Sequence, residues 1–149
     1  HKAKKRATLA EGLPAGLPSL HRAFRLQDRA AGVGFDWPTV EGPLAKVEEE
    51  LAEVRGELAA MPARPEHGPL YDNAHALLEA ELGDLLFAVV NVCRKAGVHP
   101  ALALDRANAK FTRRFERIEA KAVERGLDVK TAGLEALDAL WDEAKAEGL

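Results

Sequence analysis

The chain has 149 residues, of which 47% are hydrophobic and 30% charged, and this balance is typical of one folded, soluble domain and argues against disorder. A net charge of -3 argues against a DNA or RNA partner, because nucleic-acid binders usually carry an excess of Lys and Arg. No apolar run approaches the ~20 residues of a membrane span, and the first residues lack a signal-peptide core, so we expect a cytoplasmic protein without membrane contact.

The first elements along the chain are a tail and a short helix. Residues 1–16 combine a basic cluster with the stretch EGLPAGLP and are predicted to be a basic tail or linker, followed by one domain over 17–149. Ser19 is predicted to cap a helix that runs through about Ala31, with Leu20, Ala23, Phe24 and Gln27 on one face. A compact turn, GFDWP, follows.

Two helices with strong apolar patterns come next. One begins at Pro43, and its apolar residues recur at spacings of 3 and 4, which predicts one core stripe of Leu44, Val47, Leu51, Val54 and Leu58. After a loop, MPARPEHGP, Asp72 or Asn73 is predicted to cap a helix that ends at Lys95. This helix is apolar nearly all round and contains the single cysteine, Cys93, so we expect it to be buried on most sides and the thiol to be inert in a reducing compartment.

The last two helices are predicted from Pro100 to just before Gly126, and from about Gly133. No segment alternates apolar and polar residues over the length of a strand, and no repeat has a solenoid period. The sequence therefore predicts an all-α helical bundle.

Acidic residues on the second helix form the first candidate for chemistry. Glu49, Glu50 and Glu53 fall within one sector of a helix that turns ~100° per residue, and Glu50 borders the core stripe. A solvated acidic face is the commoner interpretation of such a pattern, so this motif by itself is weak.

Glu81 and Asp84 on the third helix strengthen the case for a metal site. Neither has a Lys or Arg within four residues, and an unpaired carboxylate in an apolar helix must be protonated, paired with a distant cation or bound to metal. If these two helices pack antiparallel, the carboxylates of EExxE and ExxD face each other. An all-oxygen cluster selects Mg²⁺, with Mn²⁺ as a possible substitute, and favours a phosphate substrate.

Basic residues on the fourth helix could hold that phosphate chain. In NAKFTRRFER, Lys110 and Arg114 are four apart, as are Arg113 and Arg117, and such side chains suit phosphate oxygens. An ordinary solvated face is the alternative, and we prefer it for Arg117. Trp37 and Trp141 are each either core residues or stacking partners for a nucleobase.

The segments KVEEELAEV, LEAELGDLLFAVVN and NAKFTRRF, preceded by VGFDWP, resemble the MazG-type nucleoside triphosphate pyrophosphohydrolases. The resemblance spans roughly Gly16 to Trp141 and implies an all-α fold with a four-helix core per site, completed in a homodimer. It implies that Mg²⁺ is coordinated by Glu50, Glu53, Glu81 and Asp84, beside Glu49. It also implies that the nucleotide is contacted by Lys46, Lys110, Arg113, Arg114 and Trp141.

The reaction that the resemblance implies is attack of water on the α-phosphorus, so that an NTP yields NMP and diphosphate. Glu49, Glu50 and Glu53 are the catalytic candidates, and the sequence does not decide whether Glu49 or Glu50 orients the water. The cellular task would be nucleotide-pool cleaning or control of a nucleotide signal. The basic, linker-like start resembles the junction before the second domain of tandem MazG proteins, which favours a chain that follows a first MazG-like domain.

Three alternatives remain open. A di-iron carboxylate bundle requires Glu-x-x-His pairs, which this sequence lacks. A catalytically inactive nucleotide-binding dimerisation module is expected to have lost a carboxylate, and no motif position is visibly lost. Relatives specific for dCTP, dUTP or phosphoribosyl-ATP share the same acidic motifs and differ in a base pocket that the sequence does not reveal.

Overall fold

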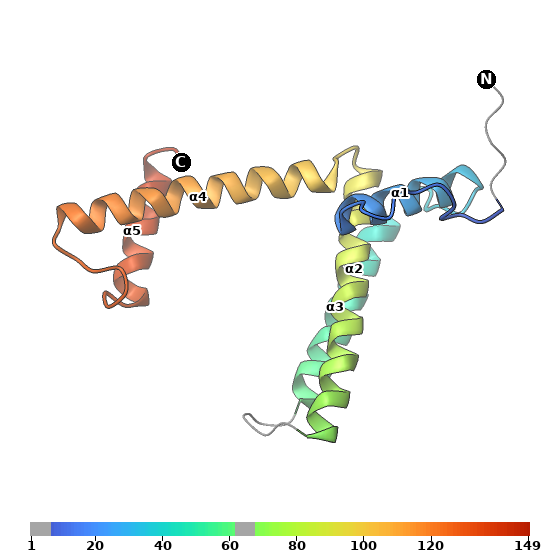
Figure 1. The fold of residues 1–149 in the computed structure, drawn as a ribbon, viewed down its shortest axis with the longest axis horizontal. Coiled ribbons are helices and arrows are strands. Elements are labelled where there is room, and N and C mark those ends of the chain that lie inside the picture. The colour runs from blue at the N-terminus through green and yellow to red at the C-terminus, as the bar shows by residue number, and fades with distance from the viewer. Residues whose placement is uncertain (1–6, 62–67) are drawn as a thin grey trace. The chain divides into compact units, whose positions relative to one another are not determined.

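The computed structural model describes residues 7–61 and 68–149, which contain five helices and no strand. The helices are α1 (Ser19–Gly32), α2 (Glu41–Ala60), α3 (Pro69–Lys95), α4 (Pro100–Glu124) and α5 (Leu134–Ala146). Figure 1 shows them along the chain. The predicted all-α class is confirmed.

The chain divides into two compact units, residues 1–101 and 102–149. In the first unit, α2 and α3 lie side by side and run in opposite directions, and α1 contacts α3 (Figure 1). This helical hairpin carries the predicted acidic residues. The second unit contains most of α4 together with α5.

Most helix boundaries lie near Gly and Pro residues, but two predicted caps are wrong, and α2 begins at Glu41 rather than at the predicted Pro43. Pro18, not Ser19, precedes α1, and it makes no side-chain cap hydrogen bond. The third helix begins at Pro69, earlier than Asp72 or Asn73, because a proline at the first helical position already has the required φ angle. The predicted loop between α2 and α3 includes residues 62–67, which lie outside the described residues.

The buried surface between α2 and α3 contains fewer apolar residues than the sequence predicts. Val54 of α2 is buried, as are Ala88 and Val90 of α3. Leu44 and Leu51 are each 41% exposed and Leu58 is 54% exposed, so the predicted continuous core stripe is wrong for these leucines. Many large apolar side chains of α3 are also exposed, because one packed neighbour covers only one side of a helix; they include Leu77, Leu82, Leu86, Phe87 and Val89.

In the second unit, the C-terminal part of α4 packs on α5. The buried residues Ile118, Ala122 and Leu140 form its core, with Phe115 and Trp141 packed against them. Ion pairs flank this core between residues on these helices or directly after them: Arg117 and Glu147, Lys121 and Glu147, and Arg125 and Glu143. Apolar packing and charge pairing therefore both hold α5 on α4.

None of the helices in the described part of the chain has both the length and the apolar content needed to cross a membrane.

Candidate functional site

Three carboxylates meet where α2 and α3 pack together. Glu50 and Glu53 lie one turn apart on α2, and Glu81 faces them from α3. Each offers one ligand oxygen, and these oxygens all lie within 4.8 Å of one another. Three hard oxygen ligands at this spacing form a group that could hold a metal ion.

The carboxylates of this cluster are not neutralised within it. Glu50 is only 6% exposed, and the Oε2 atoms of Glu50 and Glu81 are buried without a hydrogen-bond partner. The pKa of Glu81 is raised to about 7, chiefly through its hydrogen bond with Glu53, and further by desolvation and by repulsion from Glu53 and Glu50. Since a cation would satisfy the orphaned oxygens and remove the repulsion, these residues fit a hard metal ion.

Lys46 lies one turn before Glu50 on α2 and contacts both Glu50, a member of the cluster, and Glu49, which lies outside it. Its Nζ is 3.1 Å from Oε1 of Glu50 and 3.2 Å from Oε1 of Glu49. These contacts raise the pKa of Lys46, with the hydrogen bond to Glu50 as the largest cause. One oxygen of Glu50 is therefore paired with a cation while the other has no partner.

Asp84 is the predicted ligand that the structure does not bring into the three-acid group. It lies one turn after Glu81 on α3 and is exposed, and it lines the same cavity as Lys46 and Glu50. The structure therefore places the four predicted ligands in one region of the hairpin, three of them within ligand distance of one another.

The cavity beside the acids has a volume of about 850 Å³, which lies within the usual range for small-molecule sites. Lys46, Glu50 and Asp84 contribute charged side chains to its lining, and the rest of its wall is mostly apolar. That wall includes Leu26, Ala30, Phe35, Trp37, Phe87 and Ala88, with the polar residues Gln27, Asp36, Asn91 and Arg94 among them.

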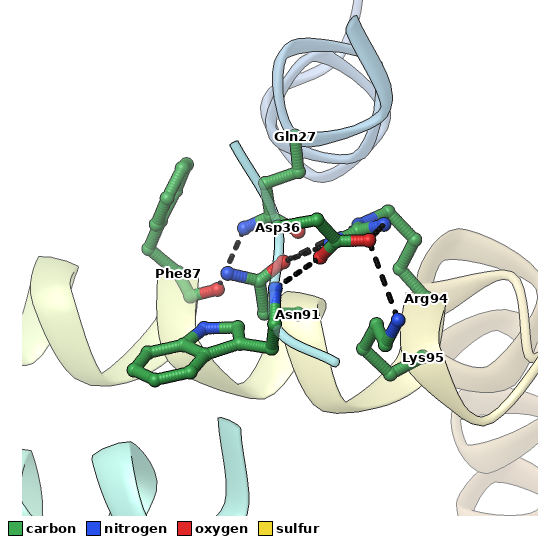
Figure 2. Close-up of polar contacts among 7 residues, drawn as sticks. Gln27, Asp36, Phe87, Asn91, Arg94 and Lys95 are labelled. Carbon is green, nitrogen blue, oxygen red and sulfur yellow. Dashed lines mark hydrogen bonds and ion pairs between the residues drawn. The ribbon is translucent and has the colours of Figure 1, made fainter. Parts of the chain in front are cut away.

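Asp36 attaches the segment GFDWP to the C-terminal end of α3. Its carboxylate accepts hydrogen bonds from both terminal nitrogens of Arg94 and lies 3.3 Å from Nζ of Lys95, as Figure 2 shows. The hydrogen bond from Arg94 is the largest of several contacts that hold the pKa of Asp36 well below its usual range. The carboxylate also accepts a hydrogen bond from the backbone N–H of Trp37 at 2.8 Å. The ion pairs of Asp36 with Arg94 and Lys95 therefore hold the segment next to Trp37, and with it this part of the cavity wall, against α3.

Trp37 rests against the first turn of α2. A Cβ atom at Gly42 would overlap Cδ2 of the indole ring at 2.6 Å, so the ring can lie here only because position 42 has no side chain. The structure therefore places Trp37, which the sequence left ambiguous, in the cavity wall, where it is 42% exposed.

Gln27 is a cavity residue to which the sequence pattern assigns only a place on the first helix. It is 5% exposed, its Nε2 donates a hydrogen bond to the backbone oxygen of Phe87 at 2.9 Å, and its Oε1 is buried without a partner (Figure 2). The available signal was a polar amide on the otherwise apolar face of the first helix. Asp36 and Arg94 were not singled out either, because their contact joins segments 58 positions apart in the sequence.

The basic residues of α4 belong to the second unit. Lys110 and Arg113 are exposed, whereas Arg114 is half-buried with its guanidinium 5.1 Å from the ring centre of Trp141. Nε of Arg114 also donates a hydrogen bond to the backbone oxygen of Leu149 at 2.6 Å. Arg117 pairs with Glu147, which agrees with a structural interpretation of that residue.

Trp141 has both a packing role and an accessible part. It is half-buried, packs against the core of the second unit and lies 5.6 Å from the ring of Phe111. Its geometry therefore explains its place on the apolar side of α5 without a ligand.

The fold and the site define an all-α protein with a carboxylate cluster, one member of which, Glu50, also lines a large cavity. No family model matches the chain. It is 40% identical over 144 residues to the nucleoside triphosphate pyrophosphohydrolase of Escherichia coli strain K12, a match that covers 97% of this chain and 51% of that protein. It is 37% identical over 144 residues to the nucleoside triphosphate pyrophosphohydrolase/pyrophosphatase MazG of Thermotoga maritima, with the same coverage.

A shorter match joins 46% of the chain to 14% of the uncharacterized protein YabN of Bacillus subtilis, at 50% identity over 68 residues. The resemblance to MazG-type nucleoside triphosphate pyrophosphohydrolases is confirmed, since the chain is related to proteins of that name over nearly its whole length. The chain spans about half the length of these two curated relatives.

Proposed function

We propose that this chain catalyses the hydrolysis of nucleoside triphosphates to NMP and diphosphate, with Mg²⁺ as the required metal. The observation that carries the proposal is the cluster of Glu50, Glu53 and Glu81, with two orphaned carboxylate oxygens, beside a cavity large enough for a nucleotide. The pyrophosphohydrolase names of relatives that match 97% of the chain support the same reaction.

The metal ligands in this proposal are Glu50, Glu53 and Glu81, with Asp84 at the edge of the cavity. Carboxylates without His or Cys suit Mg²⁺ or Mn²⁺. A bound Mg²⁺ would neutralise part of the triphosphate charge. Because Asp84 is one helical turn from Glu81, its carboxylate is available for the same ion or for its waters.

Cationic side chains would bind the phosphate chain. Lys46 is the candidate in the first unit, and its present partners Glu49 and Glu50 show that it is held beside the acids. Lys110, Arg113 and Arg114 are the candidates in the second unit, where Lys110 and Arg113 are exposed. Trp141 would contribute to nucleotide binding next to Arg114.

In the proposed reaction, an oxygen of water forms a bond to the α-phosphorus while the bond from this phosphorus to the bridging oxygen breaks. The bonding electrons leave with diphosphate, and the water proton passes to a carboxylate. Glu49 or Glu50 would orient the water, since both contact Lys46, the cation proposed to bind the phosphate chain. Glu53 is the third proposed catalytic acid. Positioning and charge neutralisation would supply most of the catalysis, as is general for phosphoryl transfer.

The proposal also covers the assembly of the protein and its cellular role. We propose a homodimer, which would cover the exposed apolar side chains of α3, and a first MazG-like domain preceding this one, in keeping with relatives twice as long. A single cysteine fits a cytoplasmic enzyme, and pool cleaning or control of a nucleotide signal would be its task.

Product analysis tests the proposed reaction directly. The purified chain is incubated with each of the eight common NTPs and dNTPs, with and without Mg²⁺, and the products are identified by ion-exchange chromatography. We expect NMP and diphosphate, formed only with metal. Release of NDP and phosphate, or no turnover of any nucleotide, would contradict the proposal.

A further inference from the structure

We propose that Gln27 determines specificity by accepting a hydrogen bond from an N–H group of the substrate's nucleobase, which enters the cavity beside the carboxylate cluster. This inference rests on the proposed function, because it names the part of the nucleotide that this cavity receives. It also identifies a recognition residue outside the acidic and basic motifs.

The orientation of the Gln27 amide follows from its surroundings. The Phe87 backbone oxygen can only accept a hydrogen bond, so the Gln27 NH₂ group must face it, as their distance of 2.9 Å requires. The Oε1 atom consequently points away from Phe87, and it is buried without a hydrogen-bond partner. A buried carbonyl oxygen without a donor is destabilising, and a ligand that supplies an N–H group would satisfy it.

The neighbouring groups suit a flat heteroaromatic ring. Phe35, Trp37 and Phe87 all line the cavity, and aromatic side chains offer faces or edges on which a base can pack. Asn91 lines it too, and its Oδ1 accepts a hydrogen bond from Nη2 of Arg94 at 3.0 Å. The Asn91 NH₂ group is therefore directed away from Arg94 and can serve as a donor.

The position of the cavity ties this recognition to catalysis. Lys46, Glu50 and Asp84 line the same cavity as Gln27, so a ligand inside it can reach these charged side chains. The base would occupy the aromatic part, and the phosphates would extend toward the carboxylates. Gln27 can therefore act through substrate binding without touching the reacting phosphorus.

The experiment compares natural substrates with analogues that lack a base N–H group. The values of kcat/KM are measured for ATP against purine riboside triphosphate, and for CTP against pyrimidin-2-one riboside triphosphate. We expect the wild-type protein to prefer the natural nucleotide roughly 10- to 100-fold, because the analogue leaves Oε1 without a donor. Equal values for both pairs in the wild-type protein would overturn the inference, and this comparison requires no mutation.

The substitution Gln27→Met removes the acceptor while keeping the length of the side chain. We expect its preference for the natural nucleotide to fall toward one, mainly through a higher KM for ATP or CTP. Leu20→Met is the matched control on α1, since Leu20 is half-buried and does not line the cavity, and it should keep the wild-type preference. An unchanged preference in a folded Gln27→Met protein would also overturn the inference.

Binding separates this inference from the proposed reaction. If the wild-type protein forms no NMP from any nucleotide, the proposed function fails. AMP and purine riboside monophosphate are then titrated into the wild-type protein by isothermal titration calorimetry. A lower Kd for AMP supports the role of Gln27, and identical Kd values reject it.

Discussion

At the scale of single residues, the carboxylate cluster makes the most direct prediction. Glu53→Gln and Asp84→Asn should each abolish turnover, because each removes a charge needed to hold Mg²⁺ while leaving a side chain of similar size. Helical circular dichroism should be unchanged. Glu48→Gln is the control, since Glu48 is exposed on the same helix outside the cluster, and full activity in both test variants would eliminate this metal site.

The raised pKa of Glu81 predicts how stability depends on pH. An ordinary glutamate loses its proton near pH 4.5, whereas folded Glu81 retains it up to about pH 7. The folded state therefore binds more protons between these values, and stability falls as pH rises through this window. Without metal, the Tm measured by thermal denaturation should be lower at pH 8 than at pH 5.5.

Mg²⁺ should reverse this trend, because it competes with the proton for the same carboxylates and binds more tightly at pH 8. Glu81→Gln supplies the control, since it should flatten the pH dependence measured in chelator. A Tm that is insensitive to pH in the wild-type protein would show that Glu81 titrates normally.

The residues of the acidic cluster could be predicted from sequence, whereas those of the cavity wall, apart from Trp37, could not. Glu50 and Glu53 are one turn apart on one helix, and Glu81 stands out as an acid in an apolar helix, so local spacing is sufficient. The contacts of Gln27 with Phe87 and of Asp36 with Arg94 join residues 60 and 58 positions apart. Such pairings depend on how helices pack, which periodicity does not specify.

At the scale of helices, Gly42 and Gly56 of α2 allow a matched comparison. Gly56→Ala should stabilise the protein by roughly 0.5–1 kcal/mol, because alanine favours a helix and nothing lies near the new Cβ atom. Gly42→Ala introduces its Cβ atom into the Trp37 ring and should displace it from the cavity wall. The KM for nucleotide should rise only in the Gly42 variant. Equal KM values in the two variants would show that Trp37 does not contribute to substrate binding.

Two leucines of α5 test how the second unit is held together. Leu140 is 2% exposed in its core, so Leu140→Ala should lower the free energy of unfolding by about 2–5 kcal/mol. Leu134 is 84% exposed, and Leu134→Ala should change stability by less than about 0.5 kcal/mol. Denaturant unfolding followed by circular dichroism measures both, and similar losses would contradict this assignment of the core.

The helices themselves were largely predictable, while their buried faces were not. Pro100, Gly126 and Gly133 bound α4 and α5 as the sequence indicates. The stripe on α2 repeats as a core face should, yet Leu44 and Leu58 are exposed in this chain. An apolar stripe predicts that one face of a helix is covered by other apolar residues. It does not specify whether those residues belong to the same chain or to another one.

At the scale of the whole molecule, the exposed apolar side chains of α3 bear on assembly. Leu86 is 60% exposed and Leu82 is 41% exposed, and apolar patches of this kind mark surfaces that associate. If the proposed homodimer covers them, the wild-type chain should have twice the monomer mass by light scattering, and Leu86→Glu should be monomeric. Leu134→Glu serves as the control on α5, and a monomeric wild-type chain would rule out this dimer.

The hydrogen bond between Gln27 and Phe87 has a consequence for the order of folding. The α2–α3 hairpin joins helices that are neighbours in the chain, whereas the bond from Gln27 closes a separation of 60 residues. Closing a longer loop costs more chain entropy, so the docking of α1 is expected to follow formation of the hairpin. The carboxylate cluster therefore forms with the hairpin, while the cavity is completed only when α1 docks.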